Sequence, residues 1–239
     1  MRVRAALVAT NPKKPESERV QAEVESFLLA RGVRLSRKRP DLLITIGGDG
    51  TLLWNKEFTR APVFGIGSAH SFLCQATMAN WRERLEALLA GFRIERRAML
   101  AASLNGKRLE DALNEFVVRA AGHRVLAFEL CASGTCMSFR ADGLIFSTPT
   151  GSSAYAYSSG GIELPPHARC YEIVAIAPYR RAFEYAVLSD AVRSTATVVS
   201  EMPAFVAVDG QFVHPFEGKA VLRVWKSSRT TDFAIPEDL

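Results

Sequence analysis

The feature that most constrains this chain of 239 residues is an apolar run that ends directly in a glycine-rich turn. Residues 42–46, Leu-Leu-Ile-Thr-Ile, are followed at once by Gly47-Gly48-Asp49-Gly50. A short apolar run bounded by glycines is typical of a buried strand. One Asp-Gly pair would be enough for a turn, and each further glycine costs backbone entropy. The sequence therefore predicts that these glycines do more than reverse the chain.

The N-terminal part alternates strand-like and helix-like segments. Strands are predicted at 3–9, 42–46 and 63–66. One helix places Val20, Val24, Phe27 and Leu28 on a single face and stops at Gly32. A second helix has Asn80 as its N-cap, with Glu83 three residues on, places Trp81, Leu85 and Leu88 on one face, and ends at Gly91. Such alternation predicts a parallel sheet flanked by helices, an α/β fold.

From about Ile94 the pattern changes to short apolar segments separated by turns. Asn105-Gly106 in the segment SLNGKRL and Asp209-Gly210 in the segment VAVDGQFV predict β-hairpins. We therefore expect an α/β N-terminal domain over 1–94, which carries the glycine-rich turn and is joined by the C-terminal tail 226–239. A β-rich domain of antiparallel strands is expected over 95–225.

Composition and cysteine content are those of an ordinary globular protein. The chain is 48% hydrophobic and 23% charged, and no apolar stretch reaches the length of a membrane span. The first apolar run, 5–9, is too short for a signal peptide, so a cytoplasmic location without a membrane partner is predicted. The four cysteines are expected to be reduced thiols, because Cys131 and Cys136 have no second pair at metal-ligand spacing nearby.

The net charge is +5, with basic residues concentrated at 34–40, 93–97 and 179–181. Each cluster is read either as a solvated surface or as part of a positive field that attracts an anionic substrate. Nucleic acid is not expected as a partner, because no binding motif is present and aromatic residues do not alternate with the basic ones.

The glycine-rich turn suits phosphate chemistry, because ligands of α/β sheets bind at the carboxyl ends of strands. Gly47, Gly48, Gly50 and Thr51 are predicted to form a phosphate cradle of main-chain N–H groups. Asp49 would then lie beside the phosphate, as a base that takes a proton from an attacking hydroxyl. The alternative is a glycine-rich turn with a capping aspartate, and these four residues alone do not decide between the two.

A second informative stretch runs from Phe139 to Gly161 and reads FRADGLIFSTPTGSSAYAYSSGG. Small polar residues that open a helix supply N–H and hydroxyl donors, and Tyr155 supplies a flat face on which a base can stack. The alternative is a helix with ordinary capping serines and a core tyrosine, which leaves the crowding of Gly151, Ser152, Ser153 and residues 158–161 unexplained.

Taken together, these motifs resemble those of the NAD kinase family. The resemblance spans nearly the whole chain and is carried by NPKKPES from Asn11, GGDGTLL, ALNEFVV from Ala112, the stretch from Ala141 to Gly161, and VDGQ from Val208. GGDGT alone also occurs in lipid kinases and phosphofructokinase relatives. The combination with the later block is much more specific.

The resemblance implies phosphoryl transfer from ATP to the 2′-hydroxyl of the adenosine ribose of NAD, giving NADP, within a two-domain fold. Asp49 matches the family's proton acceptor, and Gly50 lies beside it at the substrate. The other residues expected to bind NAD are Asn114 and Glu115 (adenosine part), Arg140 and Asp142 (dinucleotide), Ser153, Ala154, Tyr155 and Ser158 (adenine segment), Ala177 (nicotinamide riboside) and Gln211 (hairpin). Read alone, Asn114-Glu115 is better explained as exposed strand residues, and Asp209-Gly210 as a simple turn.

The resemblance further implies Mg²⁺ held mainly by donor phosphates, with no protein metal site, and a homodimer or homotetramer. Whether polyphosphate also serves as donor, and whether NADH is accepted, stays open. The chain departs from the family pattern at residues 67–73, where only His70 keeps its place, at Trp54, at Glu184-Tyr185, and in a short segment before residue 41. Two alternatives are therefore kept, a sensor that binds NAD or NADP without catalysis and a kinase of lipids or other small molecules.

Overall fold

The structure, a computed structural model, describes residues 3–11 and 15–237 and divides into two compact units. Unit 1 contains the chain up to Arg96 together with the residues from Thr231 onward, and unit 2 is Arg97–Thr230. The C-terminal part is rich in β-structure, as predicted. The predicted domain bounds, 1–94 with 226–239 and 95–225, stay a prediction. The motif that starts at Asn11 lies partly outside the described residues.

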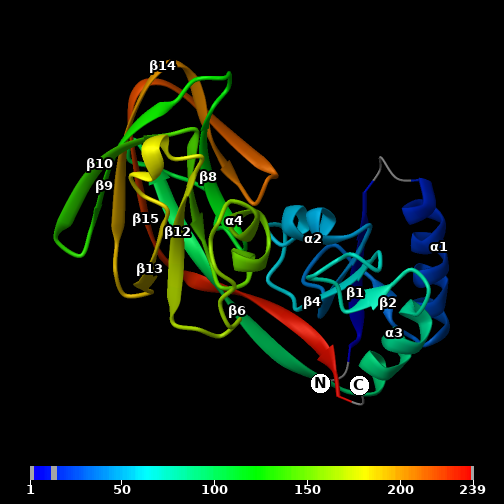
Figure 1. Ribbon diagram of the computed structural model, residues 1–239. Helices are drawn as coiled ribbons and strands as arrows, with labels where there is room; N and C mark the ends of the chain where they lie inside the picture. Colours follow the sequence, from blue (N-terminus) through cyan, green and yellow to red (C-terminus); the bar gives the residue numbers. More distant parts are fainter. Residues whose placement is uncertain (1–2, 12–14, 238–239) are drawn as a thin grey trace. The chain divides into compact units, whose positions relative to one another are not determined.

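Unit 1 contains a parallel sheet with its helices (Figure 1). Its strands lie in the order β15-β4-β3-β1-β2, and β5 pairs with β4. In chain order its elements are β1 (Ala5–Thr10), α1 (Pro15–Ala30), β2 (Arg34–Leu35), β3 (Leu42–Ile46), α2 (Asp49–Asn55), β4 (Val63–Gly67), β5 (Ala76–Thr77), α3 (Trp81–Ala90), and parts of β6 (Phe92–Leu104) and β15 (Phe212–Pro236). The predicted strand at 42–46 is thus confirmed.

Helices α1 and α3 lie side by side on one face of this sheet. The rings of Phe27 and Trp81 meet edge to face, with their centroids 5.6 Å apart. Both helices pack on alternate residues of β3 and β4, including Ile44 and Phe64. Helix α2 contacts the same strands from the opposite face. The glycine-rich turn between β3 and α2 therefore stands at the carboxyl end of a well-covered sheet.

The start of α3 differs from the prediction in its capping. The helix begins at Trp81 as expected, but the Asn80 side chain makes no cap hydrogen bond. Its Oδ1 instead accepts hydrogen bonds from the amide (2.7 Å) and the hydroxyl (3.0 Å) of Thr77. Asn80 thus closes the turn that leads into the helix, a competing local bond that asparagine side chains favour.

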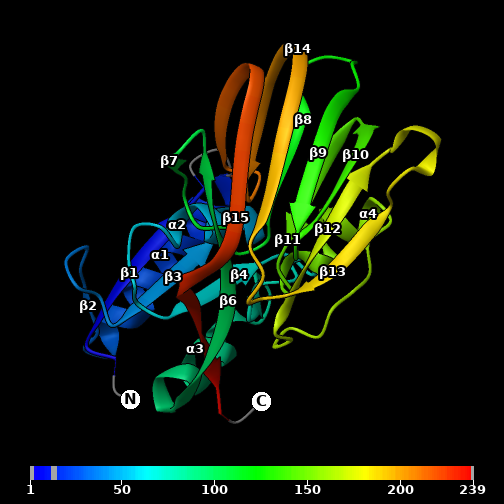
Figure 2. The same cartoon turned by 90° about the vertical axis from the view of Figure 1, so that its left-hand side faces the viewer.

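Unit 2 consists mainly of antiparallel strands, with β14 at their junction (Figure 2). The first half of β14 pairs with β9 and its second half with β8, on either side of a register shift between Ser200 and Ala204. Its elements are β7 (Lys107–Arg108), β8 (Glu115–Ala120), β9 (Leu126–Ala132), β10 (Thr135–Ala141), β11 (Gly143–Ser147), η1 (Gly151–Ser153), α4 (Tyr155–Ser158), β12 (Cys170–Ile176), η2 (Tyr179–Arg181), β13 (Tyr185–Ser189) and β14 (Ser194–Val208), with parts of β6 and β15.

Both predicted hairpin turns are confirmed. Asn105 and Gly106 have φ of 50° and 85°, and Asp209 and Gly210 have φ of 51° and 65°. Two consecutive residues with positive φ are the signature of the two-residue turn that matches the twist of its strands. The turn at Asp209 connects β14 to β15.

The expectation of four reduced cysteines is wrong for one pair. Cys131 and Cys136 form a disulfide, whereas Cys74 and Cys170 are free. The two bonded residues are direct cross-strand partners in the β9–β10 hairpin, with Cα atoms 4.1 Å apart. Their spacing in the sequence did not reveal this, because it is the tight turn at Ser133-Gly134 that places them opposite each other. Within the described part of the chain, no helix has the length and apolar character needed to cross a membrane.

Candidate active site

The glycine-rich turn has a backbone conformation that favours glycine. Gly47 and Gly48 have φ of 135° and 110°, in the region that residues with a β-carbon avoid. A β-carbon on Gly47 would also lie 2.7 Å from Oγ1 of Thr51 and 3.3 Å from Oγ of Ser17. The two glycines thus allow β3 to turn directly into α2, whose first residue is Asp49.

The Asp49 carboxylate is half-buried and held by a loop that follows β4. Its Oδ2 accepts the amide of Phe72 at 2.8 Å, and its Oδ1 accepts the amide of Leu73 at 3.0 Å. The Cys74 thiol also donates to Oδ1, at 3.5 Å. Asp49 therefore does not simply cap its own helix, and the alternative of a capping aspartate loses its support.

The predicted phosphate cradle is partly occupied by the fold itself. The amide of Gly47 donates to the carbonyl of Ile66, and the amide of Thr51 donates to the carbonyl of Gly48. The hydroxyls of Thr51 and Ser17 are buried and have no hydrogen-bond partner within residues 3–11 and 15–237. Both hydroxyls converge on Gly47, as the distances to its absent β-carbon show. What remains to meet a ligand here is hydroxyl groups and the amides of Gly48 and Gly50.

In unit 2, Asp209 connects the β14–β15 turn to the start of β8. Its Oδ1 accepts the amides of Asn114 at 2.7 Å and Glu115 at 3.1 Å, and its Oδ2 accepts the amide of Leu113 at 2.9 Å. The residue is 3% exposed, so these charge-assisted bonds are sheltered from water. Asp209 is thus a clamp that fixes the Asn114-Glu115 pair, as well as a turn residue.

The segment after β11 packs directly on that pair. The amide of Thr148 donates to the carbonyl of Asn114 at 2.9 Å. A β-carbon on Gly151 would overlap the backbone of Asn114, so only glycine fits there. The sequence motif with Gly151 therefore has a direct packing reason, and it joins two motifs that lie more than thirty residues apart in the chain.

Several polar atoms at this junction are buried without a partner. They are Oδ1 of Asn114, Oε2 of Glu115 and Oγ1 of Thr150, none of which has a hydrogen bond within the described part of the chain. Burial, and secondly the nearby Asp209 carboxylate, raise the pKa of Glu115 to about 8. Glu115 is thus largely protonated at neutral pH and can both donate and accept. Polar groups buried in this way usually meet a ligand or water. The interpretation of Asn114-Glu115 as exposed strand residues is wrong, because both residues are buried.

The adenine segment predicted from the resemblance forms one wall of this region. The Tyr155 ring packs against a small buried cluster that includes Val117 and Val174, and its hydroxyl accepts a hydrogen bond from Arg119 at 3.3 Å. Ser153 and Ala154 are half-buried, and Ser158 is exposed with its hydroxyl bonded to the carbonyl of Ala154. Tyr155 is therefore partly core and partly available as a stacking surface.

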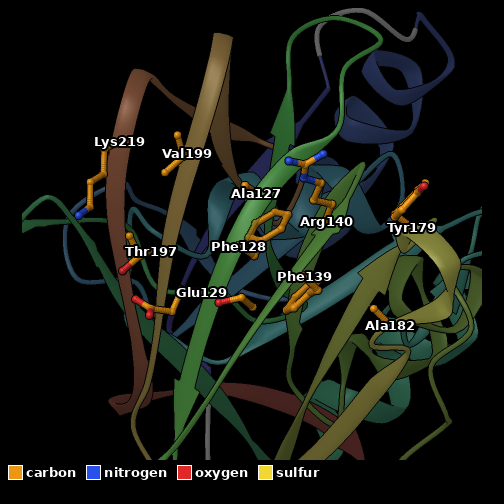
Figure 3. Close-up of a pocket in the computed structure, with 11 residues that line it drawn as sticks. Ala127, Phe128, Glu129, Phe139, Arg140, Tyr179, Ala182, Thr197, Val199 and Lys219 are labelled. Carbon is orange, nitrogen blue, oxygen red and sulfur yellow. The ribbon is translucent and has the colours of Figure 1, made fainter.

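The other predicted residues are less closely grouped. Gln211 donates from its side chain to the carbonyl of Asp209 at 3.4 Å, so it adjoins the clamp. Arg140 instead lines a cavity of about 600 Å³ on the outer face of β9, β10 and β14, together with Tyr179 and Lys219 (Figure 3). Asp142 and Ala177 are exposed, at the ends of β10 and β12.

Two further residues, one in each unit, were not predicted from the sequence. Glu172 is fully buried on β12, where its Oε2 accepts the amide of Ile162 at 3.1 Å. Its Oε1 has no partner within the described residues, and burial raises its pKa. The signal was a lone acidic residue inside an apolar strand. The other is Cys74 in unit 1, which no metal-ligand or disulfide spacing in the sequence distinguishes.

A resident metal does not fit this site. Among residues 3–11 and 15–237 there is no group of three or more His, Cys, Asp or Glu side chains that could hold a metal ion. Asp49, the acidic residue of the glycine-rich turn, already accepts two amides and a thiol.

Sequence comparison places these motifs in a known family. A family model described as the ATP-NAD kinase C-terminal domain matches residues 113–235. An NAD kinase from Methanoculleus marisnigri is 36% identical over 207 residues, covering 84% of this chain and 77% of that protein. An NAD kinase from Thermoplasma acidophilum is 31% identical over 216 residues, covering 88% and 79%.

Structural comparison agrees. The crystal structure of an NAD kinase from Archaeoglobus fulgidus in complex with ATP has a TM-score of 0.83 and 26% identity, covering 98% of this chain and 94% of that one. Yeast NADH kinase complexed with NADH has a TM-score of 0.85 at 18% identity, covering 98% and 84%, which is a likeness of fold alone. With motifs, fold and relatives in agreement, the chain belongs to the NAD kinase family.

Proposed function

We propose that this NAD kinase transfers the terminal phosphoryl group of ATP to the 2′-hydroxyl of the adenosine ribose of NAD, with Asp49 as the proton acceptor. The family supports the reaction. The observation that carries the role of Asp49 is its carboxylate, held in a fixed orientation at the carboxyl end of β3 by Phe72 and Leu73.

A ribose hydroxyl is a weak nucleophile near neutral pH and gains from a base that removes its proton as attack proceeds. A carboxylate has about four acceptor positions, and three of them are taken by the amides of Phe72 and Leu73 and the thiol of Cys74. The position left on Oδ2 is the one to which we assign the hydroxyl.

The acceptor nucleotide is assigned to unit 2. The buried atoms of Asn114 and Glu115, which have no hydrogen-bond partner among the described residues, support a contact to the adenosine part. The protonated Glu115 carboxyl can donate to a ring nitrogen or accept from an amino group. The further NAD contacts we propose are Gly50, Arg140, Asp142, Ser153, Ala154, Tyr155, Ser158, Ala177 and Gln211.

The donor phosphates are assigned to the glycine-rich turn. The amides of Gly48 and Gly50 and the hydroxyl of Thr51 supply neutral donors to phosphate oxygens. Gly47 contributes the backbone conformation. Mg²⁺ is proposed as part of the donor, held by its phosphates and by water, and it offsets their negative charge.

The reaction is tested by incubating the protein with NAD and Mg²⁺ and one donor at a time, ATP or polyphosphate, and measuring NADP. NADH in place of NAD, in the same assay, defines the acceptor. We expect Asp49→Asn to lower kcat by about 10²- to 10⁴-fold with little change in the KM for NAD. Glu86→Gln, on the exposed face of α3 in the same unit, is the matched control. Full turnover by Asp49→Asn would remove the assigned role of this carboxylate.

The same assay separates the alternatives. Tight binding of NADP without any formation of NADP from NAD would favour the sensor. The divergent loop at 67–73 is the feature that supports this alternative. A lipid kinase would need an apolar entry for an acyl chain, and the buried polar groups of Asn114, Glu115 and Thr150 argue against one. A homodimer or homotetramer is proposed from the family alone, and sedimentation velocity of the purified protein tests it.

A further inference from the structure

The loop that holds Asp49 lies on a strand surface built from glycine. Gly65 and Gly67 point to the same face of β4, because alternate strand residues share a face. A β-carbon on Gly67 would overlap the Ser71 side chain and lie 2.8 Å from Sγ of Cys74. A β-carbon on Gly65 would lie 2.9 Å from the same sulfur. The two glycines thus leave the space in which residues 68–75, here named the positioning loop, fold back onto β4.

The positioning loop is braced internally and anchored at its end. Within the loop, the hydroxyl of Ser71 accepts the amide of Ser68 at 3.1 Å. At its end, Gln75 exchanges hydrogen bonds with Gly65, through its side chain at 2.7 Å and its backbone amide at 3.0 Å. The carbonyl of Gln75 further accepts Nε of Arg84, on α3, at 3.0 Å. A loop anchored in this way can present its middle residues in a defined geometry.

The middle of the loop supplies three donors to one carboxylate. Phe72 and Leu73 donate their amides, and Cys74 donates its thiol. Burial, and secondly the Asp49 carboxylate, raise the pKa of Cys74 to about 12. The thiol therefore stays protonated near neutral pH and remains a donor.

We infer that the loop 68–75 orients the Asp49 carboxylate for proton transfer, and that Cys74 and Gly67 are positioning residues for it. The inference rests on the proposed function for the role of Asp49 as proton acceptor. Three donors leave one acceptor position, on Oδ2, and hydrogen bonds to a carboxylate favour its ionised form. Loss of the thiol donor frees part of Oδ1 and leaves the carboxylate less firmly oriented.

The activity test compares Cys74→Ala, which lacks the donor, with Cys74→Ser, which keeps a donor. Cys170→Ala, at the other free cysteine, is the matched control. We expect Cys74→Ala to lower kcat by about 10-fold while the KM for NAD stays within about 2-fold of the wild-type value. Cys74→Ser should keep most of the activity. A wild-type kcat in Cys74→Ala would overturn the inference.

A second arm does not depend on activity. Hydrogen exchange of the Phe72 and Leu73 amides should accelerate at least about 10-fold in Asp49→Ala, because both amides lose their acceptor. Gly67→Ala should accelerate the same two amides by displacing the loop, whereas Gly122→Ala, where a β-carbon meets nothing within 4 Å, should not. If the amides of Phe72 and Leu73 exchange at the wild-type rate in Asp49→Ala, the inference is wrong, even when the wild-type enzyme forms NADP. If the wild type forms no NADP, the proposed function fails, and the exchange arm alone decides whether the loop holds the carboxylate.

Discussion

Glu115 couples burial to chemistry at a single residue. It is 7% exposed, its Oε2 has no partner within the described residues, and burial raises its pKa to about 8. The backbone of the same residue is fixed by Asp209, whose carboxylate is the second cause of the shift. The charge state of Glu115 therefore matters to folding and, on the proposed function, to the binding of the adenosine part of NAD.

The pH dependence of stability tests this environment. The Glu115 carboxyl has a pKa of 4.5 when unperturbed and about 8 in the folded protein. Between these values the folded state holds a proton that the unfolded state has lost, so the free energy of unfolding falls as pH rises from about 4.5 to about 8. In Glu115→Gln we expect this fall in the free energy of unfolding, on the order of a few kcal/mol, to be absent.

Urea unfolding of wild type and Glu115→Gln at pH 5, 7 and 8.5 measures the effect. Glu217→Gln, at an exposed glutamate on β15, is the control and should leave the pH dependence as it is in wild type. A Glu115→Gln variant that loses stability with pH as steeply as wild type would show that this carboxyl ionises freely in the folded protein.

Gly151 is a second residue with a single physical requirement. A β-carbon there would overlap the backbone of Asn114, which cannot yield cheaply because Asp209 holds its amide and Thr148 its carbonyl. We expect Gly151→Ala to cost about 1–3 kcal/mol of stability and to raise the KM for NAD, since it separates the segment at 148–151 from Asn114. Gly122→Ala, with open space around it, should change neither quantity measurably. Unchanged KM and stability in Gly151→Ala would contradict this packing.

At the scale of elements, the β14–β15 hairpin acts as a clamp on β8. Asp209 accepts three buried amides, whereas Asn105, at the same position of the β6–β7 turn, accepts one exposed amide, that of Val221, at 2.8 Å. Loss of an acceptor leaves buried amides without a partner, which costs far more than the loss of an exposed bond. We expect Asp209→Ala to cost on the order of 3 kcal/mol and Asn105→Ala less than about 1 kcal/mol.

The measurement is chemical unfolding of the two variants beside wild type, with NAD affinity as a second readout. Because Asp209 fixes the backbone of Asn114 and Glu115, its loss should weaken NAD binding, and loss of the Asn105 side chain should not. Equal destabilisation by the two alanines would mean that Asp209 is a turn residue and nothing more.

These elements also show what the sequence could predict. The strand at Leu42–Ile46 and the helix at Trp81–Ala90 have the bounds that the sequence predicts. The strand ends at a glycine, and the helix begins after a polar residue and ends before a glycine. Both hairpin turns were predicted from Asn-Gly and Asp-Gly, whose positive φ is a local property. Local chemistry determines all of these features.

The features that the sequence did not predict depend mostly on contacts between residues that are far apart in the chain. The disulfide of Cys131 depends on strand register, and the orientation of Asp49 depends on a loop more than twenty residues later. The short polar strand β2 has no apolar pattern to identify it. The link between Asn114, Gly151 and Asp209 joins three separate motifs, so only the resemblance to a family suggested that they act together.

At the scale of the whole molecule, the chain returns to unit 1 at its end. β15 begins in unit 2, and its last residues, from Thr231, belong to unit 1. There Phe233 pairs with Val63 of β4, and both Phe233 and Ala234 are buried. Unit 1 is therefore built from two stretches that are far apart in sequence, and its stability should depend on the C-terminal strand.

We expect Phe233→Ala to lower the free energy of unfolding of unit 1 by about 3–5 kcal/mol, because it removes a large side chain that is 4% exposed. The matched control is Val213→Ala, on the same strand but 59% exposed, which should cost less than about 1 kcal/mol. Circular dichroism at 222 nm during urea unfolding follows the change, since the two longest helices, α1 and α3, belong to unit 1. If Phe233→Ala unfolds at the same urea concentration as wild type, the end of β15 contributes little to the core of unit 1, and the glycine-rich turn is held without it.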